Sequence, residues 1–71
     1  MLVKFLKDLG FEIRKQREKT DLSQEKLAEL AGLHRNYVGL LERGEVNVSI
    51  LNLRSIAKAL KVELRSLIPN D

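Results

Sequence analysis

The chain has 71 residues, with 13 lysines and arginines against 10 aspartates and glutamates and a formal net charge of +3 at pH 7. This length predicts a single domain, spanning residues 1–71. Its size is near the lower limit at which a hydrophobic core is stable without disulfides or a metal. The lack of cysteine excludes disulfides and cysteine-type zinc sites. No apolar run approaches the ~20 residues of a membrane span, and the apolar start is too short for a signal peptide, so we expect a cytoplasmic protein without a membrane partner.

The first predicted helix spans about residues 2–19. Its apolar residues recur at steps of three and four: Leu2, Phe5, Leu6, Leu9 and Ile13. Gly10 lies inside this helix at a propensity cost of roughly 1 kcal/mol, which indicates close packing against a neighbouring element. Asp21 is a residue at which the helix can end. The second helix follows Ser23, a good N-cap. It ends at Gly32, which can adopt the left-handed cap conformation.

A third helix is expected to begin near His34 and to run to about Arg43. Ser49 is the N-cap of a fourth helix. A short fifth turn covers residues 64–68 and ends before Pro69. Because no segment combines strand-like alternation with turn residues, the sequence predicts an all-α fold of five helices.

The spacing between residues 23 and 44 carries the functional signal. Two helices of about eight residues are joined there by Gly32, Leu33 and His34, a turn too short to let them separate. Ala28 is small where the helices cross, and five apolar residues form their shared interface: Leu27, Ala31, Leu33, Val38 and Leu41. This pattern predicts a helix-turn-helix, in which the second helix is held outward to enter the major groove of DNA.

Residues 23–28, 31–38 and 41–44 together resemble the signature of Cro/Xre-type helix-turn-helix regulators, and the likeness covers about residues 9–68. Within that family, residues 31–38 and 47–53 are similar to the small controller proteins of restriction–modification systems. The resemblance implies a phage-repressor-like (lambda repressor-like) fold. It also implies a homodimeric transcriptional regulator that binds a palindromic operator in double-stranded DNA.

The exposed face of the third helix is expected to meet the bases. Arg35 can pair with guanine and Asn36 with adenine, and the resemblance implies that both read bases, although Arg35 could touch phosphate instead. Tyr37 is also assigned to base contact, and it resembles a family aromatic whose hydroxyl can meet phosphate while the ring packs on the surface. Leu40 replaces a residue that is often polar in phage repressors, and it could touch a thymine methyl group or merely cover surface. Gly39 leaves room for the groove walls or a neighbouring side chain.

Five residues are expected to contact phosphates: Gln24, His34, Arg43, Asn47 and Ser49. Gln24 begins the second helix, where free backbone amides face outward. His34 stands where many relatives place a serine or threonine cap, so it could cap the third helix, meet phosphate or remain exposed. A lone histidine does not make a metal site. Contacts of this kind fix the register of the protein on DNA rather than its sequence preference.

Two charged residues, Arg17 and Glu42, match the family's ion pair that ties the first helix to the recognition helix, so we expect a structural role for both. A homodimer is expected because one recognition helix reads about four base pairs, whereas a two-fold pair reads half-sites about 34 Å apart. Three apolar residues are interpreted as core or dimer interface: Leu64, Leu67 and Ile68.

Enzymatic activity is not expected, because one histidine, no cysteine and no glycine-rich phosphate loop leave no catalytic constellation, metal set or cofactor site. No ligand-sensing segment follows residue 70, so no small-molecule effector is expected. The alternative is an antitoxin-like or other protein-interaction module of the same fold. The polar face formed by residues 35–37, Gln24 and Arg43 favours DNA over a protein partner.

Overall fold

The computed structural model describes residues 2–70. It contains α1 (Leu2–Lys19), α2 (Gln24–Ala31), α3 (Arg35–Glu42), α4 (Ile50–Leu60) and the 3-10 helix η1 (Leu64–Leu67). No strand occurs in this part of the chain, so the all-α prediction is confirmed. The count of five helices is wrong, because the last segment forms only a four-residue 3-10 turn. Glu63 supplies no side-chain cap to it and Pro69 follows closely, so there is no room for a further α-helical turn.

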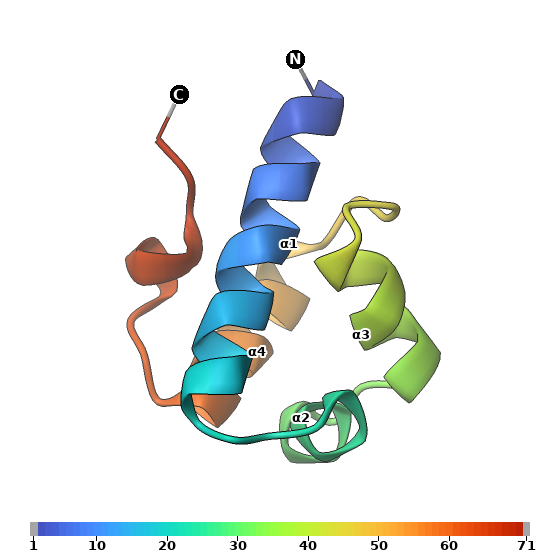
Figure 1. The fold of residues 1–71 in the computed structure, drawn as a ribbon, viewed down its shortest axis with the longest axis vertical. Coiled ribbons are helices and arrows are strands. Elements are labelled where there is room, and N and C mark those ends of the chain that lie inside the picture. The colour runs from blue at the N-terminus through green and yellow to red at the C-terminus, as the bar shows by residue number, and fades with distance from the viewer. Residues whose placement is uncertain (1, 71) are drawn as a thin grey trace.

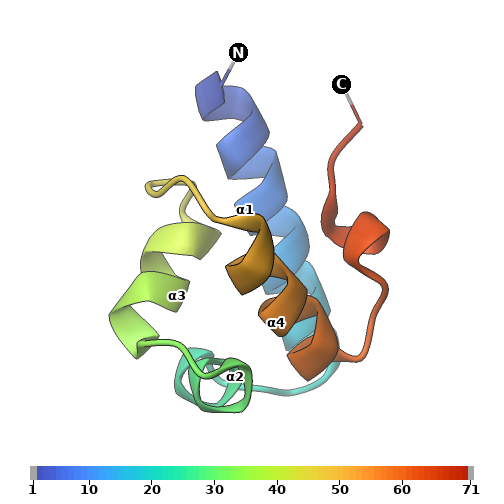
Figure 2. The ribbon, with the colours of Figure 1, turned by 180° about the vertical axis from the view of Figure 1, so that it is seen from behind.

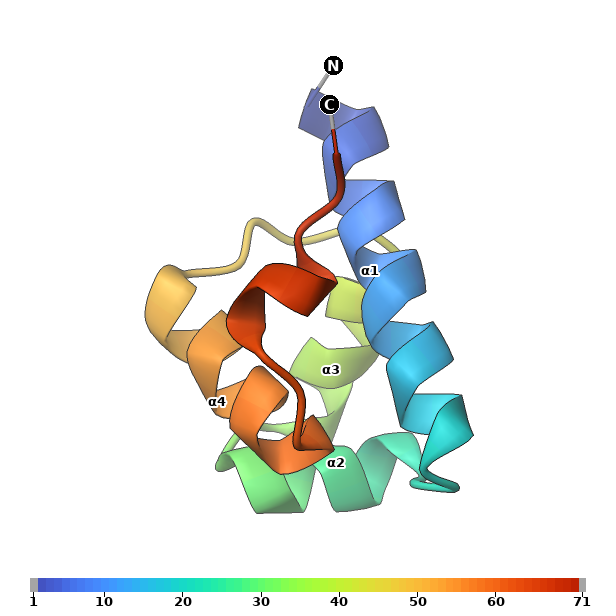
Figure 3. The same ribbon diagram turned by 90° about the vertical axis from the view of Figure 1, so that its left-hand side faces the viewer.

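The longest helix, α1, runs along the length of the molecule, with α3 on one side of it and η1 on the other (Figure 1). Seen from behind, α4 lies in front of α1 (Figure 2). The side view shows α2 lying across the bottom of the molecule, below α4 (Figure 3). The stretch after η1 turns back along the direction of α1, toward the level of its N-terminal part (Figure 3). The side of α3 away from α1 is therefore left uncovered.

Every element contributes to one apolar core, whose buried residues are Leu9, Ile13, Leu27, Ala28, Val38, Leu41, Leu53, Ile56, Ala57, Leu60 and Leu67. The predicted interface between the second and third helices is present. Leu27, Val38 and Leu41 are buried in it, and Ala31 and Leu33 are partly buried against it. The core therefore contacts only the inner face of α3, through Val38 and Leu41.

Gly10 explains how closely α1 approaches α3. A Cβ atom at this position would lie 2.5 Å from the backbone oxygen of Glu42 and closer still to that of Leu41. Any larger residue would push the two helices apart. The expected close packing at Gly10 is confirmed, and it places the end of α3 directly against the middle of α1.

The predicted helix caps are formed. The Ser23 hydroxyl accepts a hydrogen bond from the Lys26 amide at 2.9 Å, and the Ser49 hydroxyl accepts one from the Asn52 amide at 3.1 Å. Asp21, which follows α1, adopts a left-handed conformation with φ of 58°, which aspartate tolerates better than most residues other than glycine. These local contacts set where α2 and α4 begin.

Candidate nucleic-acid interface

The turn between α2 and α3 has a helix-capping residue at each end. Gly32 ends α2 in the left-handed conformation, with φ of 70°. His34 is the N-cap of α3, where its Nδ1 accepts a hydrogen bond from the Asn36 amide at 3.1 Å. Of the three roles left open for His34, the structure therefore shows capping, with the ring still exposed. The cap fixes where α3 begins and which of its residues face outward.

Six residues line an open hollow on the outer side of α3: Gln24, Arg35, Asn36, Gly39, Leu40 and Arg43. Three of the four residues assigned to base contact and two of those assigned to phosphate contact meet there. The hollow thus combines two guanidinium groups, two side-chain amides and one apolar side chain. These groups match the hydrogen-bonding and methyl pattern of base edges and the charge of phosphates.

Arg43 extends along this face. Its Nε donates to Glu45 Oε1 at 3.2 Å in an exposed ion pair. Its Nη1 lies 3.4 Å from where a Cβ atom of Gly39 would be. Because exposed ion pairs contribute little stability, the Arg43 guanidinium can exchange Glu45 for a phosphate at small cost.

Tyr37 does not line the hollow. Its half-buried ring packs against the core, and its Oη accepts a hydrogen bond from Asn52 Nδ2 at 3.3 Å. Tyr37 therefore ties α3 to α4, and the sequence-based assignment missed Asn52. No local pattern links two residues fifteen positions apart in different helices.

An ion pair between Arg17 and Glu42 joins α1 to the end of α3. Arg17 Nε donates to Glu42 Oε2 at 2.6 Å and Nη2 donates to Oε1 at 3.1 Å. The side chains are 12% and 3% exposed. The hydrogen bond to Glu42 raises the pKa of Arg17, while burial opposes this. The Arg17 guanidinium is therefore charged throughout the pH range of ordinary experiments.

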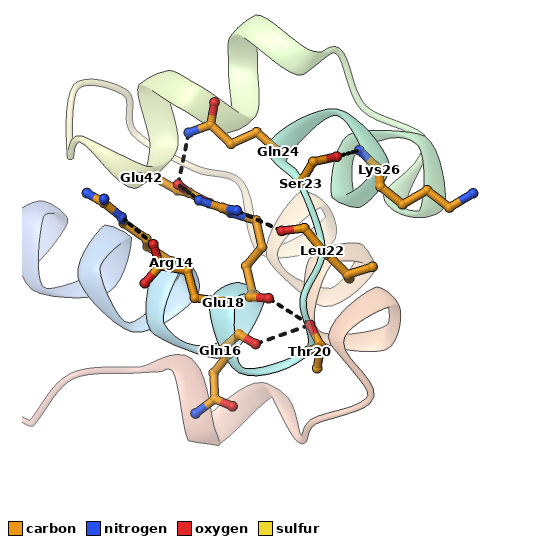
Figure 4. Close-up of polar contacts among 10 residues, drawn as sticks. Arg14, Gln16, Glu18, Thr20, Leu22, Ser23, Gln24, Lys26 and Glu42 are labelled. Atoms are coloured by element: carbon orange, nitrogen blue, oxygen red, sulfur yellow. Dashed lines mark hydrogen bonds and ion pairs between the residues drawn. The ribbon is translucent and has the colours of Figure 1, made fainter.

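Two further hydrogen bonds extend this pair into the turn before α2. Arg17 Nη1 donates to the Leu22 carbonyl at 2.7 Å, and Gln24 Nε2 donates to Glu42 Oε1 at 3.0 Å. Figure 4 shows Glu42 between Gln24 and the guanidinium that reaches Leu22. Gln24 thus gives one amide hydrogen to Glu42 and retains a second for another acceptor. The brace, meaning Arg17, Glu42, Gln24 and the Leu22 carbonyl, sets the direction of the Gln24 side chain.

Asn47 and Ser49 are exposed in the segment between α3 and α4 and do not line the hollow. The Ser49 oxygen is occupied as a cap acceptor, but its hydroxyl hydrogen is left to donate outward. Both side chains are thus accessible at the edge of the α3 face rather than within it.

The three residues interpreted as core or dimer interface separate in the structure. Leu67 is fully buried and belongs to the core, so its side chain is closed to a partner. Leu64 is partly buried against the same core, while Ile68 is 40% exposed. Ile50 and Leu51, at the start of α4, are more exposed than Ile68 and were not singled out from the sequence.

The described helices include none that is both long and apolar enough to cross a lipid bilayer.

The capped turn between α2 and α3, the buried inner side of α3 and its uncovered polar side define a helix-turn-helix protein. In agreement, residues 13–67 match the family model described as "Helix-turn-helix". The chain therefore belongs to this helix-turn-helix family of Xre-type transcriptional regulators.

Its relatives include proteins named as control proteins. The control protein C.SmaI of Serratia marcescens is 45% identical over 60 residues, covering 84% of this chain and 71% of the relative. The control protein C.BamHI of Bacillus amyloliquefaciens is 45% identical over 60 residues, covering 83% and 74%. The crystal structure of the restriction-modification controller protein C.AhdI from Aeromonas hydrophila is similar with a TM-score of 0.88. It is 48% identical, and the match covers 89% of this chain and 96% of that one.

Proposed function

We propose that this protein is a sequence-specific regulator of transcription that binds double-stranded DNA as the controller of a restriction–modification system. The observation that carries the proposal is the hollow on the outer side of α3, where Arg35, Asn36 and Arg43 gather. The similarity to proteins named as controllers supports the more particular role. A DNA partner and the bacterial origin of the relatives support a cytoplasmic site of action.

In this proposal α3 lies in the major groove. Arg35 pairs with guanine and Asn36 with adenine, while Leu40 faces the same base edges. Phosphate contacts come from five residues around α3: Gln24, His34, Arg43, Asn47 and Ser49. The second amide hydrogen of Gln24 donates to a phosphate while the first stays on Glu42, so the brace sets the register of α3 on the duplex.

Selection of binding sites from random duplexes tests this function. We expect enrichment of a palindromic site, with an affinity that falls steeply as salt rises, by about 0.9 logarithmic units per phosphate neutralised and per tenfold change in salt. Scrambled duplexes of the same length are the control, and they should bind more weakly at every salt concentration. Failure to enrich any site would refute DNA reading and favour a protein-interaction module.

The palindrome requires two copies of α3, so we further propose a homodimer. One copy is about 30 Å along its longest axis, and two recognition helices must be about 34 Å apart to reach successive turns of the major groove. Sedimentation at micromolar concentration should give twice the mass of one chain, and in the presence of the selected duplex it should give that mass plus the mass of one duplex. A strict monomer that binds single half-sites would contradict the proposal.

A further inference from the structure

Gly39 lies in the middle of α3, where alanine would favour the helix more than glycine does. The structure accounts for the other glycines. Gly32 and Gly44 adopt φ values of 70° and 73°, and Gly10 meets the backbone of α3. Gly39 has neither a positive φ nor a close backbone contact. Folding alone therefore gives no reason for glycine at this position.

An alanine would fit at Gly39. Its Cβ would lie 3.4 Å from Arg43 Nη1 and 3.7 Å from Gln24 Oε1. Both atoms end flexible side chains, and both distances are ordinary van der Waals contacts. The added methyl group would instead occupy space in the hollow on the outer side of α3. Its consequence should therefore fall on whatever enters that hollow.

The position of Gly39 within α3 shapes this space. Residues 35, 39 and 43 follow one another at four-residue steps and so lie on one stripe of the helix. Gly39 is buried beneath the flexible ends of the Arg43 and Gln24 side chains. It lines the hollow together with Arg35 and Leu40, and we call the space above it, where a Cβ atom is missing, the notch. Leu40 is thus the apolar side chain beside the notch, and the residues around it carry hydrogen-bond donors.

We propose that this notch receives the C5-methyl group of a thymine, so that Gly39 and Leu40 together determine the base preference at one position of each half-site. The proposal rests on the DNA-binding function proposed above. Among base edges in the major groove, the thymine methyl is the apolar group. When the Arg43 and Gln24 side-chain ends turn toward phosphates, the methyl group takes their place against Gly39 and the Leu40 side chain. Arg35 and Asn36 then bind the polar edges of neighbouring bases.

The test replaces each thymine of the selected site in turn by deoxyuridine, which lacks only the methyl group. At one thymine per half-site we expect the wild-type protein to lose about fourfold in affinity, the effect of one buried methyl group. Gly39→Ala should bind the thymine duplex at least about fivefold more weakly, because two methyl groups then compete for one notch. Deoxyuridine at that thymine should restore its affinity.

Two measurements distinguish a filled notch from other reasons for weaker DNA binding by Gly39→Ala. Gly39→Ala should raise the melting temperature by roughly 4–8 °C, since alanine favours a helix interior, so weaker binding would not reflect unfolding. Leu40→Ala should lose the preference for thymine over deoxyuridine without gaining one for deoxyuridine.

The outcomes are distinct. Equal weakening of all duplexes by Gly39→Ala would overturn the proposal and indicate a phosphate in the notch. Wild-type affinity of Gly39→Ala for every duplex would overturn it as well. If the wild-type protein selects no site at all, the DNA-binding function itself fails.

Discussion

Replacing Arg17 with methionine is expected to lower the free energy of unfolding by about 3 kcal/mol. The Glu42 carboxylate is 3% exposed and accepts hydrogen bonds from Arg17 and Gln24. Without the guanidinium, a buried negative charge keeps only a neutral amide as its partner. The Leu22 carbonyl also loses its donor. Unfolding in urea, followed by circular dichroism, measures the loss.

The matched control is Arg14→Met on the same helix. Arg14 pairs with Glu18 at 3.1 Å, but both side chains are more than half exposed, so its loss should amount to less than about 0.5 kcal/mol. A second comparison is the double variant Arg17→Met with Glu42→Leu. It should recover much of the stability, because it removes the buried charge as well as its partner. Equal losses in the Arg14 and Arg17 variants would show that the brace does not stabilise the fold.

Arg35→Ala is expected to weaken binding to the selected DNA site by about 1–3 kcal/mol and to relax the preference at one base position. Arg35 is exposed at the first position of α3 and lines the hollow, so its removal should leave the fold intact. Binding titrations against the selected duplex and its single-base variants measure both effects.

Arg65→Ala is the matched control for charge. Arg65 is exposed in η1, on the opposite side of α1 from α3 (Figure 1), so this variant removes the same charge without touching the proposed interface. Its affinity should stay close to that of the wild type at moderate salt. If Arg35→Ala instead weakens binding to all sequences equally, Arg35 contacts phosphate, and other residues read the bases.

The local features of this protein were predictable from its sequence. The four α-helices, the Ser23 and Ser49 caps and the glycine that ends α2 appear where the sequence predicts them. Each depends on residues within four or five positions of one another, through hydrogen bonds inside a helical turn or the periodic placement of apolar side chains. The pairing of Arg17 with Glu42 came from family resemblance, since neither residue type nor spacing indicates a contact across 25 positions.

Other features were decided by the tertiary structure. Leu67 and Ile68 are adjacent and similarly apolar, yet the packing of η1 on α1 and α4 buries the first and exposes the second. Tyr37 meets Asn52, and Gln24 meets Glu42, because the helices cross at particular points. The hollow over Gly39 likewise exists only where α2 and α3 lie together. Such contacts depend on how helices distant in the chain pack against one another, and local sequence does not encode that geometry.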